Sequence, residues 1–310
     1  MQWFSVTELA VTSAVVGLGW VAYGIAYRLF LHPLANIPGP KLAALTSWYE
    51  IYYDVVMPGK YVWKIKDLHS EYGAIIRIAP NEVHVNDLSF LDTIYAPGTH
   101  RRNKEEARNL DIGLSVGGTA DHDLHKQRRE ALSTFFSKKS VVKLGPMIAE
   151  KVQELRRRLE ECMRQETPIN LSDAYYALAI DVVSQYSFGS NDDLLGDLTQ
   201  ASVLRKNLTR LLLGVKLRSY FPWMVTITKK LSTSISKWFI PPGVLDMVKF
   251  SKKIRGEIQQ VLDGKTEAYE KRSIFCELRD NPELPQFEKS LLRLEQEGTL
   301  LVLAGTESTA

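Results

Sequence analysis

Apolar residues run without interruption near the amino terminus. From Leu9 to Tyr27 there are 19 residues without a charge, bounded by Glu8 and Arg28. At a rise of about 1.5 Å per residue, a helix of this length spans roughly 28 Å, close to the hydrocarbon core of a bilayer. The pattern predicts a single transmembrane helix over residues 9–27, within a membrane anchor formed by residues 1–31.

Two other interpretations of this run stay open, a cleaved signal peptide and a buried helix of a soluble protein. No Lys or Arg precedes the run, which disfavours a signal peptide. The first basic residues after it are Arg28 and Lys41, which predicts that the rest of the chain lies on the cytoplasmic side. Because Pro33, Pro38 and Pro40 follow closely, residues 32–41 are predicted to form a stiff hinge.

The pattern beyond the hinge is mostly helical. Apolar residues recur at helical spacing over residues 60–72, and two β-branched runs, 74–78 and 82–86, flank Pro80-Asn81 and predict a β-hairpin. Further helices are expected at about 88–95, 121–136, 140–164, 171–187, 200–213, 243–262, 265–279 and 287–309. The predicted fold class is a mainly α body with one small β-hairpin, preceded by the single transmembrane helix.

The composition excludes several classes of protein but does not indicate a function. The 310 residues are 45% hydrophobic and 24% charged, which is ordinary for one large or two smaller globular domains. A net charge of +3 gives no reason to expect nucleic acid as a partner. Two cysteines exclude a disulfide scaffold and a multi-cysteine metal site.

The first candidate site is a polar segment, residues 121–130. His125 and Arg129 are four residues apart on a predicted helix, so both side chains can reach one anionic group. A solvated charged face is the other interpretation of the same spacing. His122 and His125 could suggest a metal, but no third ligand lies nearby in the sequence, so we expect no metal site.

The second candidate site follows the apolar run Leu291–Leu303. The residues there are Ala304, Gly305, Thr306, Glu307, Ser308 and Thr309. Glycine costs about 1 kcal/mol relative to alanine in a helix, and hydroxyls compete for backbone carbonyls, so the helix should open or bend. An acid beside an alcohol there is suited to moving protons toward a ligand. A helix that frays at its carboxyl end explains the same residues.

These segments occur in the order found in one protein family. The segments Leu31-His32-Pro33-Leu34, Ile37-Pro38-Gly39-Pro40, the hairpin, the His125/Arg129 helix and residues 304–309 together resemble a membrane-bound cytochrome P-450. Residues 121–137, 181–189 and 303–309 resemble its fungal branch, whose members oxidise terpenoid and other secondary metabolites, including mycotoxin precursors.

The resemblance implies a role for each candidate residue. His125 and Arg129 would contact a propionate of the haem cofactor. Gly305 would leave room for dioxygen, with Ala304 packed beside it. Glu307 and Ser308 would deliver protons, although Asp followed by Thr is commoner in the family. Residues 101–120 and 201–249 would cover the substrate pocket.

The resemblance also implies partners and a place in the cell. An NADPH–cytochrome P-450 reductase would supply electrons, and the substrate would be a hydrophobic small molecule. The protein would be a single-pass protein of the endoplasmic reticulum membrane, with its body in the cytoplasm.

The cysteine that binds haem iron in this family is not identified in the sequence. Cys162 and Cys276 lie in helical patterns and lack the flanking glycines of the iron-binding loop. Residues 42–310 are therefore expected to be a truncated cytochrome P-450 domain, the N-terminal part of that fold, which ends inside the oxygen-binding helix and is inactive alone. The alternative is a non-catalytic, membrane-anchored protein that binds a partner or a hydrophobic small molecule.

Overall fold

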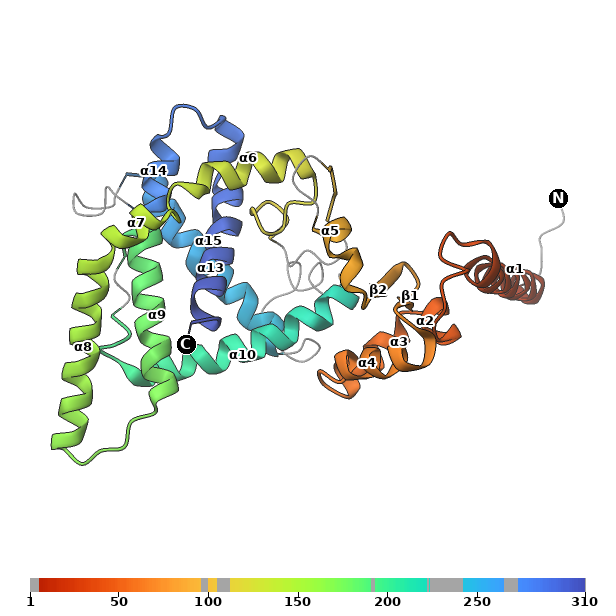
Figure 1. The fold of residues 1–310 in the computed structure, drawn as a ribbon, viewed down its shortest axis with the longest axis horizontal. Coiled ribbons are helices and arrows are strands. Elements are labelled where there is room, and N and C mark those ends of the chain that lie inside the picture. The colour runs from red at the N-terminus through yellow and green to blue at the C-terminus, as the bar shows by residue number, and fades with distance from the viewer. Residues whose placement is uncertain are drawn as a thin grey trace. The chain divides into compact units, whose positions relative to one another are not determined.

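The computed structural model describes residues 6–95, 100–104, 112–190, 193–221, 223, 242–264 and 273–309. These residues are mainly helical, with one small antiparallel sheet (Figure 1). The chain forms two compact units, Met1–His100 and Arg101–Ala310. The predicted fold class is confirmed for the described residues, whereas the predicted boundaries at residues 31 and 41 stay a prediction.

The first unit begins with a long apolar helix. Helix α1, Val6–Ala26, continues into a π-helical turn, Tyr27–Leu31. Residues Thr7–Leu31 are long and apolar enough to cross a membrane, with a mean hydropathy of 1.7, and none of that apolar stretch is buried in the protein. The predicted helix is confirmed and is longer than residues 9–27.

The rest of this unit packs short helices on a hairpin. Its elements are α2 (Lys41–Leu45), α3 (Trp48–Ile51), a π-helical turn (Tyr52–Val56), α4 (Tyr61–Tyr72), β1 (Ile75–Ala79), β2 (Glu82–Val85), a 3-10 turn (Leu88–Phe90) and α5 (Leu91–Ile94). The two strands pair antiparallel, with Ile75 opposite Val85 and an irregularity between Arg77 and Ala79. The Tyr61 hydroxyl donates to the Ile78 carbonyl, which fixes α4 on β1. The predicted helix over 60–72 and the hairpin are confirmed.

The described residues of the second unit form helices and connecting loops, with no strand. Its elements are α6 (His122–Ser133), α7 (Lys138–Lys143), α8 (Gly145–Arg164), α9 (Leu171–Phe188), α10 (Leu198–Tyr220), α13 (Pro242–Leu262), α14 (Ile274–Asp280), a 3-10 turn (Gln286–Lys289) and α15 (Leu291–Glu307). The predicted single helix over 140–164 is wrong, because Pro146 cannot donate to the carbonyl of Val142 and its ring would clash there, which divides it into α7 and α8. Of the helix predicted over 265–279, residues 265–272 lie outside the described residues.

The core of the second unit gathers around α15. Phe188 of α9 and Phe275 of α14 stack with ring centroids 5.1 Å apart, and Ile258 of α13 and Leu294 of α15 are buried in the same cluster. Apolar burial of this kind contributes about 1.5–3 kcal/mol per large side chain. The core therefore sets the position of α15, on which the candidate site is built.

The predicted opening of the last helix is wrong over the described residues. Helix α15 continues through Gly305 to Glu307. The hydroxyls of Thr306 and Ser308 donate to the carbonyls of Val302 and Ala304, each four residues back. The hydroxyls therefore bond to the helix's own backbone without breaking it.

Candidate functional site

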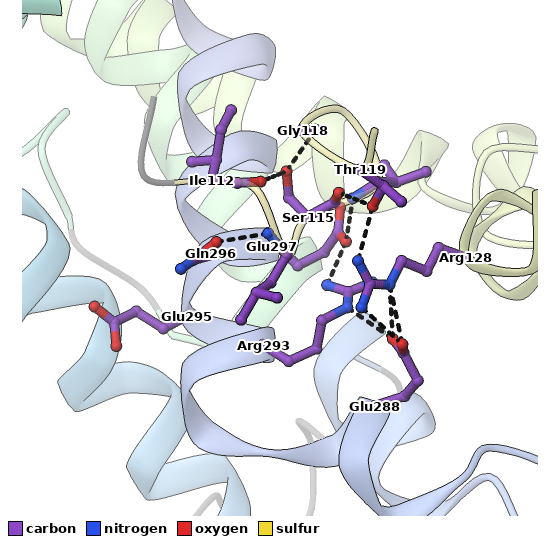
Figure 2. Close-up of polar contacts among 12 residues, drawn as sticks. Ile112, Ser115, Gly118, Thr119, Arg128, Glu288, Arg293, Glu295, Gln296 and Glu297 are labelled. Carbon is purple, nitrogen blue, oxygen red and sulfur yellow. Dashed lines mark hydrogen bonds and ion pairs between the residues drawn. The ribbon is translucent and has the colours of Figure 1, made fainter. Parts of the chain in front are cut away.

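A buried network of charged side chains joins α6 to the start of α15 (Figure 2). Nε of Arg128 on α6 donates to Oε1 of Glu288 at 3.0 Å, and its Nη2 donates to the same oxygen at 2.8 Å. Nε of Arg293 donates to Oε2 of Glu288 at 2.8 Å. Nη1 of Arg293 lies 2.6 Å from Oε2 of Glu297, one turn further along α15. Two guanidinium groups and two carboxylates thus balance their charges inside the protein.

This network also holds the loop of residues 112–120. The backbone N–H of Leu114 donates to Oε1 of Gln296 at 2.8 Å, and the N–H of Val116 donates to Oε2 of Glu297 at 2.9 Å. Nη1 of Arg128 donates to Oγ1 of Thr119 at 2.8 Å. Side chains of α6 and α15 therefore fix the described part of the loop that the resemblance places over the substrate. Residues 105–111 of that loop lie outside the described residues.

The tight turn in this loop requires glycine. A Cβ on Gly118 would overlap the carbonyl oxygen of Ile112, and the N–H of Gly118 donates to Oγ of Ser115 at 3.1 Å. Oγ of Ser115 in turn donates to the Ile112 carbonyl at 2.6 Å (Figure 2). The loop closes on itself through these bonds before it meets α15.

None of the predicted site residues belongs to this network, although the sequence carries two signals of it. Arg128 is four residues before Leu132, and the two are the buried residues of α6. Arg293 and Glu297 stand four residues apart in an otherwise apolar helix, a spacing that allows an ion pair. His125, half-buried, lies one turn before Arg128 on α6, whereas Arg129 is exposed, so the spacing of His125 and Arg129 does not reveal the buried arginine between them.

The network makes the stability of the fold depend on pH. Burial alone would raise the pKa of Glu288, but hydrogen bonds and charge from Arg128 and Arg293 outweigh it and lower that pKa. The pKa of this carboxyl is lower in the folded protein than in the unfolded chain, where it is near 4.5. The carboxylate therefore stabilises the fold at pH values above 4.5. This stabilisation is lost as the pH falls through the pKa of the folded state.

We expect Glu288→Gln to reduce this acid dependence. The free energy of unfolding of the full chain should decrease as the pH drops below about 4.5. This decrease should be shallower in the variant. Chemical denaturation in detergent between about pH 3 and pH 7 measures both slopes. Equal slopes for the two proteins would contradict the assignment.

His125 and Arg129 lie among other basic side chains. Burial lowers the pKa of the half-buried His125, and the positive charges of Lys104, Arg129 and His122 lower it further. Nζ of Lys104 donates to the Gly117 carbonyl at 2.9 Å, and burial lowers the pKa of that lysine. Within the described ranges, neither the His125 nor the Arg129 side chain has a hydrogen-bond or ion-pair partner. We call Lys104, His122, His125 and Arg129 the cationic cluster, and its charge suits a bound carboxylate.

The second predicted group lies at the end of α15. Ala304 and Ser308 are exposed, and Oγ of Ser308 donates to the Ala304 carbonyl at 2.6 Å. A Cβ on Gly305 would lie 2.6 Å from Cγ2 of Val183, so this glycine lets α9 pack closely on α15. The side chain of Glu307 lies outside the described residues. No hydrogen bond or ion pair among the described side chains joins this group to the cationic cluster.

The two cysteines lie apart from both groups of predicted residues. Cys162 is half-buried on α8, and Cys276 is 2% exposed in the core beside Phe275. Among the described residues, no group of three His, Cys, Asp or Glu side chains could hold a metal ion.

A cavity of about 220 Å³ lies between α9, α10, α13 and α15. Its lining is mostly apolar and includes Tyr176, Ile180, Phe188, Phe250 and Val302. For scale, an apolar cavity of about 150 Å³ holds benzene. The cavity can therefore hold a small apolar molecule.

No protein-family profile matches the chain. Comparison with single known proteins, however, gives similar relatives. The chain is 38% identical over 295 residues to conidiogenone synthase PchP450 of Penicillium rubens, an alignment that covers 92% of this chain and 58% of that protein. It is 39% identical to the cytochrome P-450 monooxygenase tpcC of Cochliobolus heterostrophus, over 98% of this chain and 59% of that protein. It is 35% identical to the cytochrome P-450 monooxygenase TRI4 of Fusarium sporotrichioides, over 96% of this chain and 58% of that protein.

The chain thus spans a little under three fifths of the length of these curated relatives. The similarity extends over nearly the whole chain and includes α6, the loop of residues 112–120 and α15. The chain belongs to the cytochrome P-450 family, and the relatives named above are fungal members of it.

Proposed function

We propose that the chain is part of a membrane-anchored monooxygenase that oxidises a hydrophobic secondary metabolite of terpenoid or mycotoxin type. The observation that carries the proposal is the similarity to fungal monooxygenases over more than nine tenths of the chain. Electrons would come from NADPH through a reductase, and molecular oxygen would be the co-substrate. Residues 7–31 would hold the protein in the endoplasmic reticulum membrane. Arg28 and Lys41 would keep the body cytoplasmic.

The cationic cluster fits the propionates of haem, the cofactor of this family. When bound, haem supplies the iron that activates oxygen. Arg129 offers a planar fork for a carboxylate, and Lys104 adds a charge held beside the loop by the Gly117 carbonyl. His125 would gain a proton as the anion arrives, since a nearby negative charge favours the charged imidazole.

The axial thiolate does not fit either cysteine of the sequence. Cys276 is sealed in the apolar core, and Cys162 lies on the charged helix α8. In the whole protein we infer that the thiolate comes from residues outside this sequence. Residues 1–310 would then hold haem through the cationic cluster alone, and neither cysteine would bind its iron.

The end of α15 would handle oxygen and protons. Ala304 and Gly305 would border the space for dioxygen, and Glu307 with Ser308 would deliver protons to it. The Ser308 hydroxyl donates to the Ala304 carbonyl, so it must leave this acceptor before it can pass a proton to a ligand.

A reduced carbon monoxide difference spectrum tests this proposal. We expect no thiolate-type Soret band from purified residues 1–310, because Cys276 is buried in the apolar core and Cys162 lies on the charged helix α8. The protein translated from the complete transcript, expressed in the same way, should show that band. A thiolate band from residues 1–310, or its absence from the protein of the complete transcript, would contradict the proposal.

The apolar cavity between α9 and α15 favours a second function, the binding of a hydrophobic molecule without catalysis. In that case residues 1–310 should accumulate in cells as a folded, membrane-bound protein. Rapid degradation of this chain, with no partner that copurifies, would count against it.

A further inference from the structure

Arg77 on β1 is a buried cation, and no described residue is an acidic partner to it. It is 2% exposed, and its Nη atoms donate to the backbone carbonyls of Arg28 at 2.9 Å, Leu34 at 3.4 Å and Pro80 at 2.7 Å. Its Nε has no hydrogen-bond partner in the described part of the chain. Burial lowers the pKa of Arg77, and the charge of Arg28 lowers it further. Since an uncompensated buried charge is costly, this guanidinium would gain from a bound anion.

A cavity of about 310 Å³ lies beside this arginine. Its lining includes Leu29, Phe30, Ile37, Pro38, Lys41 and Arg77. Lys41 is exposed and makes no ion pair within the described ranges, so two cations and no carboxylate line the cavity. Asn36 and Tyr72 add polar groups to the lining, and the remaining lining residues are apolar.

The wall of the cavity is fixed to the hairpin. The backbone N–H of Arg77 donates to the Pro38 carbonyl at 2.7 Å. Gly39, at φ +156°, approaches β1 so closely that a Cβ would overlap the Arg77 carbonyl oxygen. Residues 38–39 therefore hold their position against the strand that carries the arginine.

The cavity also lies where the apolar helix ends. Residues 29–31 close the stretch Thr7–Leu31 and line the cavity through Leu29 and Phe30. If that stretch spans a bilayer, the cavity lies at the level of the lipid headgroups, where anionic lipids attract basic residues. Free phosphate would need the two cations alone, whereas the apolar lining also suits the glycerol and acyl carbons of a lipid.

We propose that this cavity binds the phosphate of an anionic phospholipid, with Arg77 and Lys41 as its cationic contacts. The proposal rests on the proposed membrane anchor. It assigns the Pro-rich hinge a ligand-binding role in addition to its role as a spacer, because Arg28, Leu34 and Pro38 hold Arg77 in place through their carbonyls.

Titration calorimetry on residues 1–310 in neutral detergent tests the site. The probes are dihexanoyl phosphatidate, dihexanoyl phosphatidylcholine and inorganic phosphate. We expect saturable binding of phosphatidate, and an affinity that falls about fivefold in Lys41→Gln, the effect of one interfacial lysine. Lys60→Gln, an exposed lysine of the same unit that does not line the cavity, should bind as the natural chain does.

Three results would overturn the proposal. They are equal affinity for phosphatidate and phosphatidylcholine, unchanged affinity in Lys41→Gln, and inorganic phosphate binding as tightly as phosphatidate, which would indicate a free-anion site. Arg77→Lys keeps the charge but loses the fork, and it should weaken phosphatidate binding if it keeps the helical circular dichroism of the natural chain. Extraction of cell membranes with alkaline carbonate tests the anchor separately, because its failure would leave binding in detergent unchanged.

Discussion

Arg128→Met should destabilise the second unit by about 3–5 kcal/mol, because it leaves the buried carboxylate of Glu288 with one partner instead of two. The side chain of Arg128 is 6% exposed, so water cannot replace the guanidinium. The loop of residues 112–120 should loosen as well, since Thr119 loses its donor. Chemical denaturation of the full chain in detergent, followed by circular dichroism, measures the loss.

An exposed ion pair provides the control for this variant. Arg156→Met removes the partner of Glu160 on α8, where both side chains are more than half exposed. Such surface pairs contribute about 0.3–0.5 kcal/mol, so little should change. The double variant Arg128→Met/Glu288→Gln should recover part of the loss, because the buried negative charge is removed. Equal effects of the Arg128 and Arg156 variants would show that the buried network adds no stability.

Phe275→Ala should cost about 3–5 kcal/mol, the usual effect of removing a buried aromatic ring. Phe275 is 0% exposed and stacks on Phe188, so its loss opens a cavity between α9 and α14. The same denaturation experiment measures the effect. Phe287→Ala is the matched control, because that ring is 63% exposed and its removal should change the unfolding free energy by less than about 1 kcal/mol. A loss at Phe275 no greater than at Phe287 would contradict the described core.

Helical periodicity and the hairpin could be predicted from the sequence because each depends on residues close together in the chain. Apolar spacing located α4, and the β-branched runs on either side of Pro80-Asn81 located the two strands. Periodicity does not show the break at Leu144, because the apolar pattern continues through it, although Pro146 just beyond it disfavours a continuous helix.

The candidate site was only partly predictable. The positions of His125 and Arg129 on one helix follow from their spacing, and their cationic surroundings agree with an anion site. The pairing of Arg128 with Glu288 spans 160 residues, and no local pattern encodes a contact at that distance. Gly305 shows a different limit, because a glycine in a helix can serve a ligand or a neighbouring helix, and here Val183 occupies the space beside it.

The attachment of residues 112–120 to α15 has a consequence for how such a protein can diversify. Gln296 and Glu297 hold the loop through the backbone N–H groups of Leu114 and Val116, and these groups are present whatever non-proline side chain stands there. Amino-acid replacements in the loop can therefore alter the surface offered to a small molecule while its anchoring points persist. Two side chains on a rigid helix thus allow the residues at positions 114 and 116 to change between descendants, whereas Gly118 and the hydroxyls of Ser115 and Thr119 are needed to keep the path of the loop.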